Sequence, residues 1–441
     1  MDGSGDMKFT ICEDETTATT AKSRQRLLSL SVPPSPWFGL DIGGTLAKLV
    51  YFEPQDDELF DETDEEFIRN KRIQRYLFSK KAYANSGFRD EQLQLKDVEI
   101  NSRIGTLHFI RFPTDRMVDF IGLVKDKGFA RLISTICATG GGAVKYAEHA
   151  EKILGMQFHK ADELDSLIKG IEFIAANNPN ECYYYENPLN DQTCKKVIWR
   201  WSSGRSSTSN LLNDEKKDGL QYPYIVCNIG SGVSVLTVRG HNNFERITGS
   251  SIGGGFFQGL CAIMCGCDSF EESIELASHG DNKNVDKLVR DIYGSDYAQV
   301  GLSGDVVAAS FGKIGSSKNR DKVARADLAR SALVTTANNI GSIAFYAAKS
   351  CNIDRIVFVG NFLRVNPIAA RLLSYAMTFW SKGTKKAIFL MHEVRFHFVN
   401  SVLQALGYLG AVGCLHKLVD VTNMRRQVRA MNGDLTLKDS L

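Results

Sequence analysis

The hydrophobic pattern of this chain predicts an α/β protein in which short apolar strands are interspersed with amphipathic helices. Two stretches, 37–54 (WFGLDIGGTLAKLVYFEP) and 222–240 (YPYIVCNIGSGVSVLTVRG), each contain an apolar strand, a turn of small residues and a second apolar strand. Further apolar runs predict strands at 106–112 and 132–139, and the stretch 326–350 predicts a long helix. The pattern therefore indicates strand hairpins combined with helices.

Polar stretches predict how the chain is divided into domains. Residues 1–35 mix Thr, Ser, Asp and Glu without an apolar pattern, so we expect a disordered N-terminal extension. The polar loop that ends near residue 220 predicts a boundary between an N-terminal lobe (36–220) and a C-terminal lobe (221–419). The chain ends in a polar tail, 420–441.

The first hairpin has the composition of a phosphate-binding turn. Asp41 ends its first strand, and residues 43–45 (GGT) form the turn. Glycine lets the backbone approach a bulky anion, and successive turn N–H groups can converge on a phosphate. An ordinary tight hairpin is the alternative for this stretch alone. Residues 41–44 (DIGG) align with 228–231 (NIGS), so we interpret the second hairpin as an internal copy, which favours the phosphate-binding interpretation.

Glycine-rich turns also follow other predicted strands. Gly140–Gly142 and Gly253–Gly255 each precede a helical pattern. Such a turn is a natural anion site because free N–H groups and the helix dipole point the same way, but it also serves for simple chain reversal. The strand that begins near residue 354 breaks at Gly360 and Asn361, where a glycine can let an adenine or ribose lie against the backbone.

An acidic motif opens the helix predicted within 159–177. Apolar residues from Leu164 to Ile174 recur at helical spacing, and Glu163 falls beside the edge of this stripe. Asp162 points roughly opposite, and Asp165 lies on the other flank. We therefore expect Glu163 to be half-buried in the first turn, where the helix dipole keeps a carboxylate ionised. The alternative is that all three acids only favour the helix N-terminus.

Composition narrows the class of protein. The 441 residues suggest two or three lobes, and 43% hydrophobic with 24% charged residues is typical of a globular chain. A net charge of +2 gives no reason to expect a nucleic acid or an anionic membrane as partner. No run of about 18 apolar residues predicts a membrane span. Acidic residues near the N-terminus argue against an organelle transit peptide, so we expect a cytoplasmic protein, with a nuclear or organellar pool left open.

The ten cysteines lack the regular spacing of a disulfide framework, which predicts reduced thiols. Cys261, Cys265 and Cys267 form a C-x3-C-x-C cluster that suggests a metal site as one alternative. No second half of such a site follows, and the surrounding residues are apolar and helical. We therefore expect core packing, and we assign no protein residue as a metal ligand.

Several motifs together resemble the eukaryotic-type (type II) pantothenate kinases, within the acetate and sugar kinase, Hsp70 and actin superfamily. The resemblance covers about residues 36–414 and rests on DIGGTLAKL, FIRFPT, CATGGGA, DELDSLIKG, NIGSGVSVL, TGSSIGGG, SFEE, DKLVRDIYG and RIVFVGNFLRVN. It implies a two-lobed actin-like ATPase (ribonuclease H-like) fold, with duplicated phosphate-binding hairpins and mixed sheets flanked by helices.

The resemblance also implies roles for individual residues. The general base falls on Glu163, and the ligands of pantothenate or acyl-coenzyme A fall on Ser231, Ser234 and Arg246. The adenosine motif falls on Gly360 and Asn361. ATP phosphates would be held, with Mg²⁺ near Asp41, by Gly43, Gly44, Thr45 and Lys48.

The function implied is ATP-dependent phosphorylation of pantothenate to 4'-phosphopantothenate, the first step of coenzyme A biosynthesis, in a homodimer inhibited by acyl-coenzyme A. A sugar or amino-sugar kinase of the same superfamily and a nucleotide-switched, non-catalytic regulator are the alternatives. The chain departs from the family pattern at 394–406 (VRFHFVNSVLQAL), an insert between LMHE and GYLGAVG.

Overall fold

The structure is a computed structural model. In it the chain forms two compact units. Unit 1 comprises residues 1–166 and 411–441, and unit 2 comprises residues 167–410. The residues that it describes are 37–44, 46–55, 88–101, 103–126, 135–155, 157–199, 220–315, 323–363, 366–392, 397–399, 402–404 and 407–420. The expected N-terminal extension and all but residue 420 of the expected polar tail lie outside these residues.

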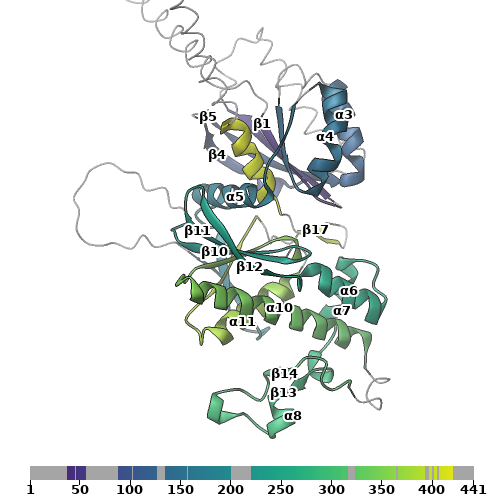
Figure 1. Cartoon of the computed structure of the whole chain (residues 1–441), viewed down its shortest axis with the longest axis vertical. Coiled ribbons are helices and arrows are strands. Elements are labelled where there is room, and N and C mark those ends of the chain that lie inside the picture. The colour runs from purple at the N-terminus through teal and green to yellow at the C-terminus, as the bar shows by residue number, and fades with distance from the viewer. Residues whose placement is uncertain are drawn as a thin grey trace, which may run out of the picture. The chain divides into compact units, whose positions relative to one another are not determined.

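A mixed sheet forms the centre of unit 1 (Figure 1). Its strand order is β3-β5-β2-β1-β6-β7, with β4 paired to β5. The hairpin strands β1 and β2 are antiparallel, β5 is antiparallel to β2, and β6 and β7 continue parallel to β1. The strands are β1 (Trp37–Ile42), β2 (Leu46–Pro54), β3 (Phe88–Arg89), β4 (Leu95–Ile100), β5 (Arg103–Pro113), β6 (Thr135–Thr139) and β7 (Gln157–Lys160).

Helices cover both faces of this sheet because side chains alternate between the faces along each strand. Phe38, Leu40 and Ile42 pack with residues of α3 (Met117–Asp126) and α4 (Gly141–Leu154) on one face. On the other face Cys137 packs with Cys414 and Leu418, in the helix formed by residues 409–420. A Cβ on Gly39 would lie 2.0 Å from the Ala411 carbonyl oxygen, so glycine is required for this close approach.

Unit 2 repeats the same arrangement around the second hairpin. Its sheet has the order β12-β11-β10-β15-β16-β8-β9. Here β10, β11 and β12 are antiparallel, whereas β15 and β16 run parallel to β10. The strands are β8 (Cys182–Glu186), β9 (Lys195–Ile198), β10 (Tyr224–Ile229), β11 (Val233–Gly240), β12 (Asn243–Ser250), β15 (Ile356–Val359) and β16 (Ala387–Leu390).

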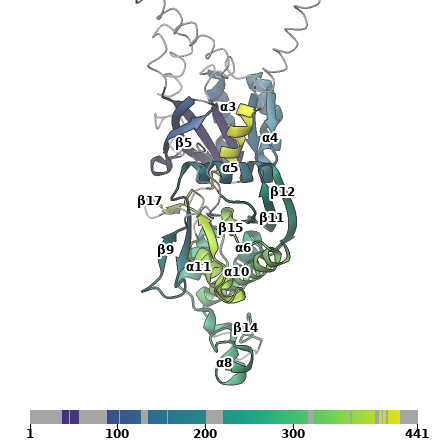
Figure 2. The same cartoon turned by 90° about the vertical axis from the view of Figure 1, so that its left-hand side faces the viewer.

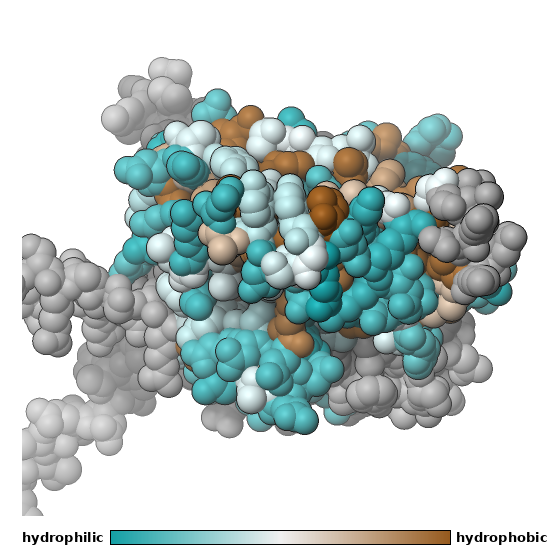
Figure 3. All heavy atoms as spheres, turned by 90° about the horizontal axis from the view of Figure 1, so that it is seen from below, coloured by the Kyte–Doolittle hydropathy of each residue, from teal (hydrophilic) through white to brown (hydrophobic). Residues whose placement is uncertain are grey.

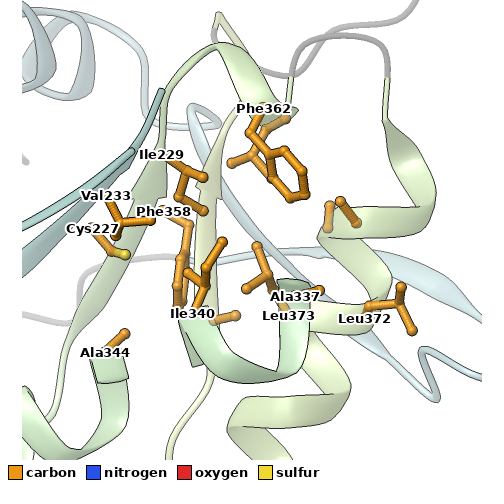
Figure 4. Packing of buried hydrophobic residues seen from close by; sticks show 14 of the residues in the cluster. Cys227, Ile229, Val233, Ala337, Ile340, Ala344, Phe358, Phe362, Leu372 and Leu373 are labelled. Atoms are coloured by element: carbon orange, nitrogen blue, oxygen red, sulfur yellow. The ribbon is translucent and has the colours of Figure 1, made fainter. Parts of the chain in front are cut away.

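The hydrophobic core of unit 2 lies between this sheet and long helices. Ile229 and Phe358 of the sheet pack with Ala337 and Ile340 of α10 (Figure 4). The three clustered cysteines 261, 265 and 267 are members of this core, where burial raises the pKa of the Cys261 thiol to about 12. The helices that contribute to this core are α6 (Gly254–Cys265), α7 (Phe270–Ser278), α10 (Arg325–Ser350) and α11 (Pro367–Trp380). A further helix, α5 (Glu163–Asn177), begins in unit 1 and continues into unit 2.

A small extension of unit 2 projects from the region of α10 (Figure 2). It contains β13 (Lys287–Leu288), α8 (Val289–Tyr293) and β14 (Val307–Ala309). The carboxylate of Asp286, which is fully buried, accepts hydrogen bonds from Asn282 Nδ2 and from the Phe311 backbone N–H, at 2.8 and 2.9 Å. On the molecular face in Figure 3, hydrophobic residues are scattered among hydrophilic ones.

Five strands of each unit share one topology, in which the spatial order is third, second, first, fourth and fifth along the chain. This repeat confirms the predicted α/β fold with duplicated hairpins. The unit boundaries differ from the expected lobe boundary at residue 220, because β8 pairs with β16 in the unit 2 sheet. The chain passes from unit 1 to unit 2 inside the continuous helix α5, where the composition of the sequence does not mark a boundary.

Two further findings concern the insert 394–406 and the helices of the described residues. Within the insert 394–406 the structure describes only β17 (His397–Val399) and β18 (Val402–Gln404), which pair antiparallel with each other. Among the described residues, no helix combines the length and the apolar character needed to cross a membrane.

The close approach of glycine to backbone in unit 1 yields a stability prediction. A Cβ on Gly413 would lie 1.9 Å from the Ser166 carbonyl oxygen. We expect Gly413→Ala to lower the free energy of unfolding by about 1–3 kcal/mol, measured by denaturant titration, because neither backbone can yield easily. Gly122→Ala in α3 is the control, since none of the described residues has an atom within 4 Å of its Cβ position. Equal stability of the two variants would contradict this packing.

Candidate active site

The first hairpin places a lysine and an aspartate opposite each other. Asp41 on β1 and Lys48 on β2 are register partners, and Lys48 Nζ lies 3.2 Å from Asp41 Oδ2. The Lys48 side chain is 8% exposed and that of Asp41 is 19% exposed. The turn is closed by a hydrogen bond from the Gly43 N–H to the Leu46 carbonyl oxygen at 3.0 Å. Gly44 is exposed there, and Thr45 lies outside the described residues.

The glycine turn before α4 packs against this hairpin. Gly140 has φ +83°, and a Cβ on it would lie 2.6 Å from the Ile42 carbonyl oxygen and 2.9 Å from Asp41 Oδ1. Only glycine combines this conformation with such close packing. The N-terminus of α4 therefore opens beside Asp41, in the arrangement that favours an anion through unpaired N–H groups and the helix dipole.

The three acids of the DELD motif have three different environments. Asp162 Oδ1 accepts a hydrogen bond from the Asp165 N–H at 2.8 Å, as a helix cap does. Asp165 Oδ2 pairs with Lys417 Nζ at 3.1 Å. Within the described part of the chain, Glu163 makes no hydrogen bond or ion pair. Its carboxylate is thus the one of the three that is available to an external proton donor.

The electrostatic environment of Glu163 differs from the sequence expectation. Glu163 belongs to the exposed residues of α5, yet partial desolvation by the surrounding protein raises the pKa of its carboxyl. The negative charges of Asp41 and then Asp162 raise this pKa further, and Lys48 opposes them. The helix dipole was expected to keep this carboxylate ionised. The shift of the pKa runs against this effect of the dipole, because it arises from desolvation and from a charge on β1, which periodicity along one helix cannot reveal.

The second hairpin reproduces this geometry with neutral groups. Asn228 and Ser234 are register partners, as Asp41 and Lys48 are in unit 1. Gly360 has φ +108°, and a Cβ on it would lie 2.4 Å from the Ile229 carbonyl oxygen and 2.6 Å from Asn228 Oδ1. This contact matches the packing of Gly140 on Asp41. Asn228 was not among the predicted site residues, although its alignment with Asp41 was the available signal.

The predicted substrate ligands lie close together in unit 2. Arg246 Nε donates a hydrogen bond to Ser234 Oγ at 3.2 Å. Gly249 leaves room for this arginine, because a Cβ there would lie 2.2 Å from Arg246 Nη2. Arg246 is exposed, and Ser231 is exposed in the adjacent turn, where its carbonyl oxygen accepts a hydrogen bond from the Gly255 N–H at 3.0 Å.

The predicted nucleotide motif of unit 2, Gly360 and Asn361, follows β15 directly. After Gly360, Asn361 is exposed and begins a short 3-10 helix, Asn361–Leu363. Phe362 behind it is buried and contributes to the unit 2 core. The predicted residues thus form one group in unit 1 around Asp41, Lys48 and Glu163. A second group in unit 2 comprises Ser231, Ser234, Arg246, Gly360 and Asn361.

The charge arrangement in unit 1 predicts how the pKa of Glu163 responds to mutation. Asp41→Asn removes a negative charge that raises this pKa, so the pKa should fall toward its ordinary value. Titration of the Glu163 carboxyl by NMR measures the change. Asp119→Asn, an exposed acid on α3, is the control and should leave the Glu163 pKa unchanged. A pKa in Asp41→Asn equal to that of the wild type would show that the two carboxyls do not interact.

Comparison with known proteins identifies relatives over most of the chain. Residues 37–417 match the Fumble family. Pantothenate kinase 1 of Arabidopsis thaliana is 36% identical over 376 residues, which are 85% of this chain and 83% of the relative. The 4'-phosphopantetheine phosphatase of Mus musculus is 33% identical over 389 residues, which are 88% of this chain but only 41% of the mouse protein.

The solved structures that match this chain are more distant in sequence. The activator of 2-hydroxyisocaproyl-CoA dehydratase from Clostridium difficile, with bound ADPNP, has a TM-score of 0.41 and 14% identity, covering 90% of this chain and 98% of its own. Glucokinase from Balamuthia mandrillaris, in complex with glucose, has a TM-score of 0.36 and 13% identity, covering 92% and 99%. The match across 37–417 and the identity to the Arabidopsis enzyme show that this chain belongs to the Fumble family, the pantothenate kinases that its motifs resemble.

Proposed function

We propose that this protein is an ATP-dependent pantothenate kinase that forms 4'-phosphopantothenate, the first step of coenzyme A biosynthesis. One observation carries the proposal: the Asp41–Lys48 ion pair lies at a glycine hairpin, and desolvation together with the charge of Asp41 raises the pKa of the available Glu163 carboxylate. A phosphate site beside a carboxylate base suits transfer of a phosphoryl group to an alcohol. The kinship with a pantothenate kinase supports pantothenate as that alcohol.

ATP binding is assigned to groups that can neutralise or cradle phosphates. Lys48 supplies a positive charge, and Gly44 and Thr45 are assigned as backbone N–H donors. Gly43, whose N–H closes the turn on the Leu46 carbonyl oxygen, is assigned to the phosphates because glycine lets them approach the backbone. Gly360 and Asn361 are assigned to the nucleoside, because a glycine lets the ligand approach the backbone. In phosphoryl transfer the protein mainly positions the reactants and stabilises charge, and this set of groups meets that requirement.

The carboxylate of Asp41 also fits a role as a ligand of Mg²⁺. Asp41 offers a carboxylate whose Oδ1 faces Gly140, while its Oδ2 accepts the Lys48 ion pair. In the described residues no group of three or more His, Cys, Asp or Glu side chains could hold a metal. Mg²⁺ characteristically uses one or two carboxylates together with water and substrate phosphates, so Asp41 is its proposed protein contact. When bound, the ion would neutralise charge on the ATP phosphates.

Glu163 is assigned as the general base. Its carboxylate accepts the proton of the pantothenate primary hydroxyl as the hydroxyl oxygen attacks the γ-phosphorus of ATP. The bond from that phosphorus to the β,γ-bridging oxygen breaks, and ADP leaves. A raised pKa makes a carboxylate a stronger base, so the influence of Asp41 serves this step.

Arg246 and the two serines are assigned to the acceptor. Arg246 uses Nε for Ser234, and its exposed guanidinium can bind the carboxylate of pantothenate through charge-assisted hydrogen bonds. Acyl-coenzyme A contains the same pantoyl group, with an amide in place of the free carboxylate. We therefore assign it, as a feedback inhibitor, to the same residues, Ser231, Ser234 and Arg246. Binding of the two ligands would then be mutually exclusive.

The assembly and compartment are also proposals. Tyr346 on α10 is 52% exposed and Trp380 at the end of α11 is 36% exposed, with ring centroids 5.9 Å apart. Exposed aromatic residues are enriched in protein interfaces, which supports a homodimer. Nine cysteines of the described residues are free thiols, which suits the reducing cytoplasm.

The base assignment predicts the behaviour of Glu163→Gln. Its kcat for pantothenate should fall by about 10²-fold or more, because proton acceptance is lost, whereas ATP affinity should be retained. Steady-state kinetics and calorimetric ATP titration measure the two effects. Glu148→Gln, an exposed glutamate on α4, is the control and should keep wild-type kcat. A near-normal kcat in Glu163→Gln would remove Glu163 as the base.

The same substitution predicts a pH-dependent stability effect. Because the Glu163 pKa is raised in the folded state, its ionisation opposes folding. The opposition is absent below the unfolded-state pKa and develops as pH rises through the folded-state pKa. Glu163→Gln should therefore be at least as stable as wild type at pH 7, with no stability advantage at pH 3, as measured by denaturant unfolding. Lower stability at pH 7 would reverse the sign.

The acceptor assignment predicts the effect of Arg246→Ala. Loss of a charge-assisted contact worth about 1.5–3 kcal/mol should raise the KM for pantothenate roughly 10-fold or more. Acyl-coenzyme A inhibition should weaken in parallel, and the KM for ATP should be retained. Arg239→Ala, at an exposed position on β11, is the matched control. If both pantothenate KM and inhibition are unaffected in Arg246→Ala, this arginine does not bind either ligand.

A further inference from the structure

A transverse row of paired residues crosses the sheet of unit 1 through the Asp41–Lys48 pair. Asp41 on β1 pairs with Thr139 on β6 and with Lys48 on β2. Lys48 pairs in turn with Arg111 on β5, and Arg111 pairs with Phe88 on β3. Residues that are directly opposed in a sheet project their side chains from the same face. Arg111 therefore extends from the sheet beside Lys48.

The two cations of this row are both buried. Lys48 is 7% exposed and Arg111 is 6% exposed. Like charges directly opposite each other on neighbouring strands repel, and more strongly where water is excluded. This repulsion favours a separation of the two cationic groups, each toward a carboxylate of its own.

Each cation has such a carboxylate. Lys48 pairs with Asp41, and Arg111 Nε donates to Oδ2 of Asp90 at 3.2 Å. Asp90 is itself 4% exposed, and the Arg111 guanidinium lies 5.0 Å from the centroid of the Phe88 ring. The order of charges is therefore Asp41, Lys48, Arg111 and Asp90, with the two cations between the two carboxylates.

We propose that Arg111 is a positioning residue that holds Lys48 toward Asp41 and the phosphate hairpin, both by repelling Lys48 and by occupying Asp90. The inference rests on the proposed ATP-binding role of Lys48. Arg111 acts through Lys48 and does not contact the nucleotide. In the corresponding row of unit 2, Asn228 and Ser234 are neutral, and Gly249 occupies the position that matches Arg111. The charged row is therefore specific to unit 1, which supports a role for its charges at this site.

A pair of variants tests this proposal. Arg111→Met removes the repulsion and leaves Asp90 without its arginine, so Lys48 should shift toward Asp90. The Kd for ATP, measured by calorimetry, and the KM for ATP should then rise about 10-fold, with the KM for pantothenate unchanged. In Arg111→Met/Asp90→Asn the competing carboxylate is gone, and the Kd for ATP should return to within about threefold of wild type. Arg103→Met, a buried arginine on the same strand that lies over Trp37, is the control and should keep wild-type ATP affinity.

The outcomes separate this inference from the proposed function. Wild-type ATP affinity in Arg111→Met overturns the positioning role, and so does a 10-fold loss that persists in the double variant, which would indicate direct nucleotide contact. If Arg111→Met does not fold, the double variant decides, because its neutral pair removes both charges together. A wild-type protein that binds no ATP would contradict the proposed function itself.

Discussion

The register of the first hairpin is the constraint on which the rest of the candidate site depends. A buried lysine is costly unless a carboxylate compensates it, and the pairing of β1 with β2 places Lys48 opposite Asp41. The other groups are arranged around this pair. Gly140 packs against Asp41, and the pKa of Glu163 is raised by desolvation and then by the charge of Asp41. A slip of one residue would turn Lys48 to the other face, toward the apolar cluster under α3 and α4.

Duplication gives both units the same backbone plan with different chemistry. In each unit a hairpin strand pairs with a parallel strand that ends at a positive-φ glycine, Gly140 or Gly360. The aspartate and lysine of unit 1 correspond to Asn228 and Ser234 in unit 2. The charged row suits phosphates and a metal ion. The neutral row leaves one cation, Arg246, which reaches Ser234 across the space above Gly249.

Local patterns predicted the elements of this fold, but they could not predict relations set by tertiary structure. The two hairpins, the long helix α10 and the glycine turns follow from residue type and periodicity, and the structure contains them. The same periodicity placed Glu163 in the first helical turn correctly, but it could not reveal the desolvation and the charge of Asp41 that raise the pKa of its carboxyl. The space that Gly249 leaves for Arg246 depends on a bulged strand pairing. The opposition of Arg111 and Lys48 joins strands far apart in sequence. The passage between units inside α5 has no local signature, because the helix is continuous there.

The central claim is that the Asp41, Lys48 and Glu163 group transfers a phosphoryl group from ATP to pantothenate. The most direct test is to offer the purified protein ATP and Mg²⁺ with pantothenate and, separately, with a panel of hexoses and amino sugars, and to identify the products by mass spectrometry. We expect 4'-phosphopantothenate to form together with an equal amount of ADP, and no sugar to be phosphorylated. Phosphorylation of a sugar without phosphorylation of pantothenate, or ATP binding with no transfer to any acceptor, would contradict it.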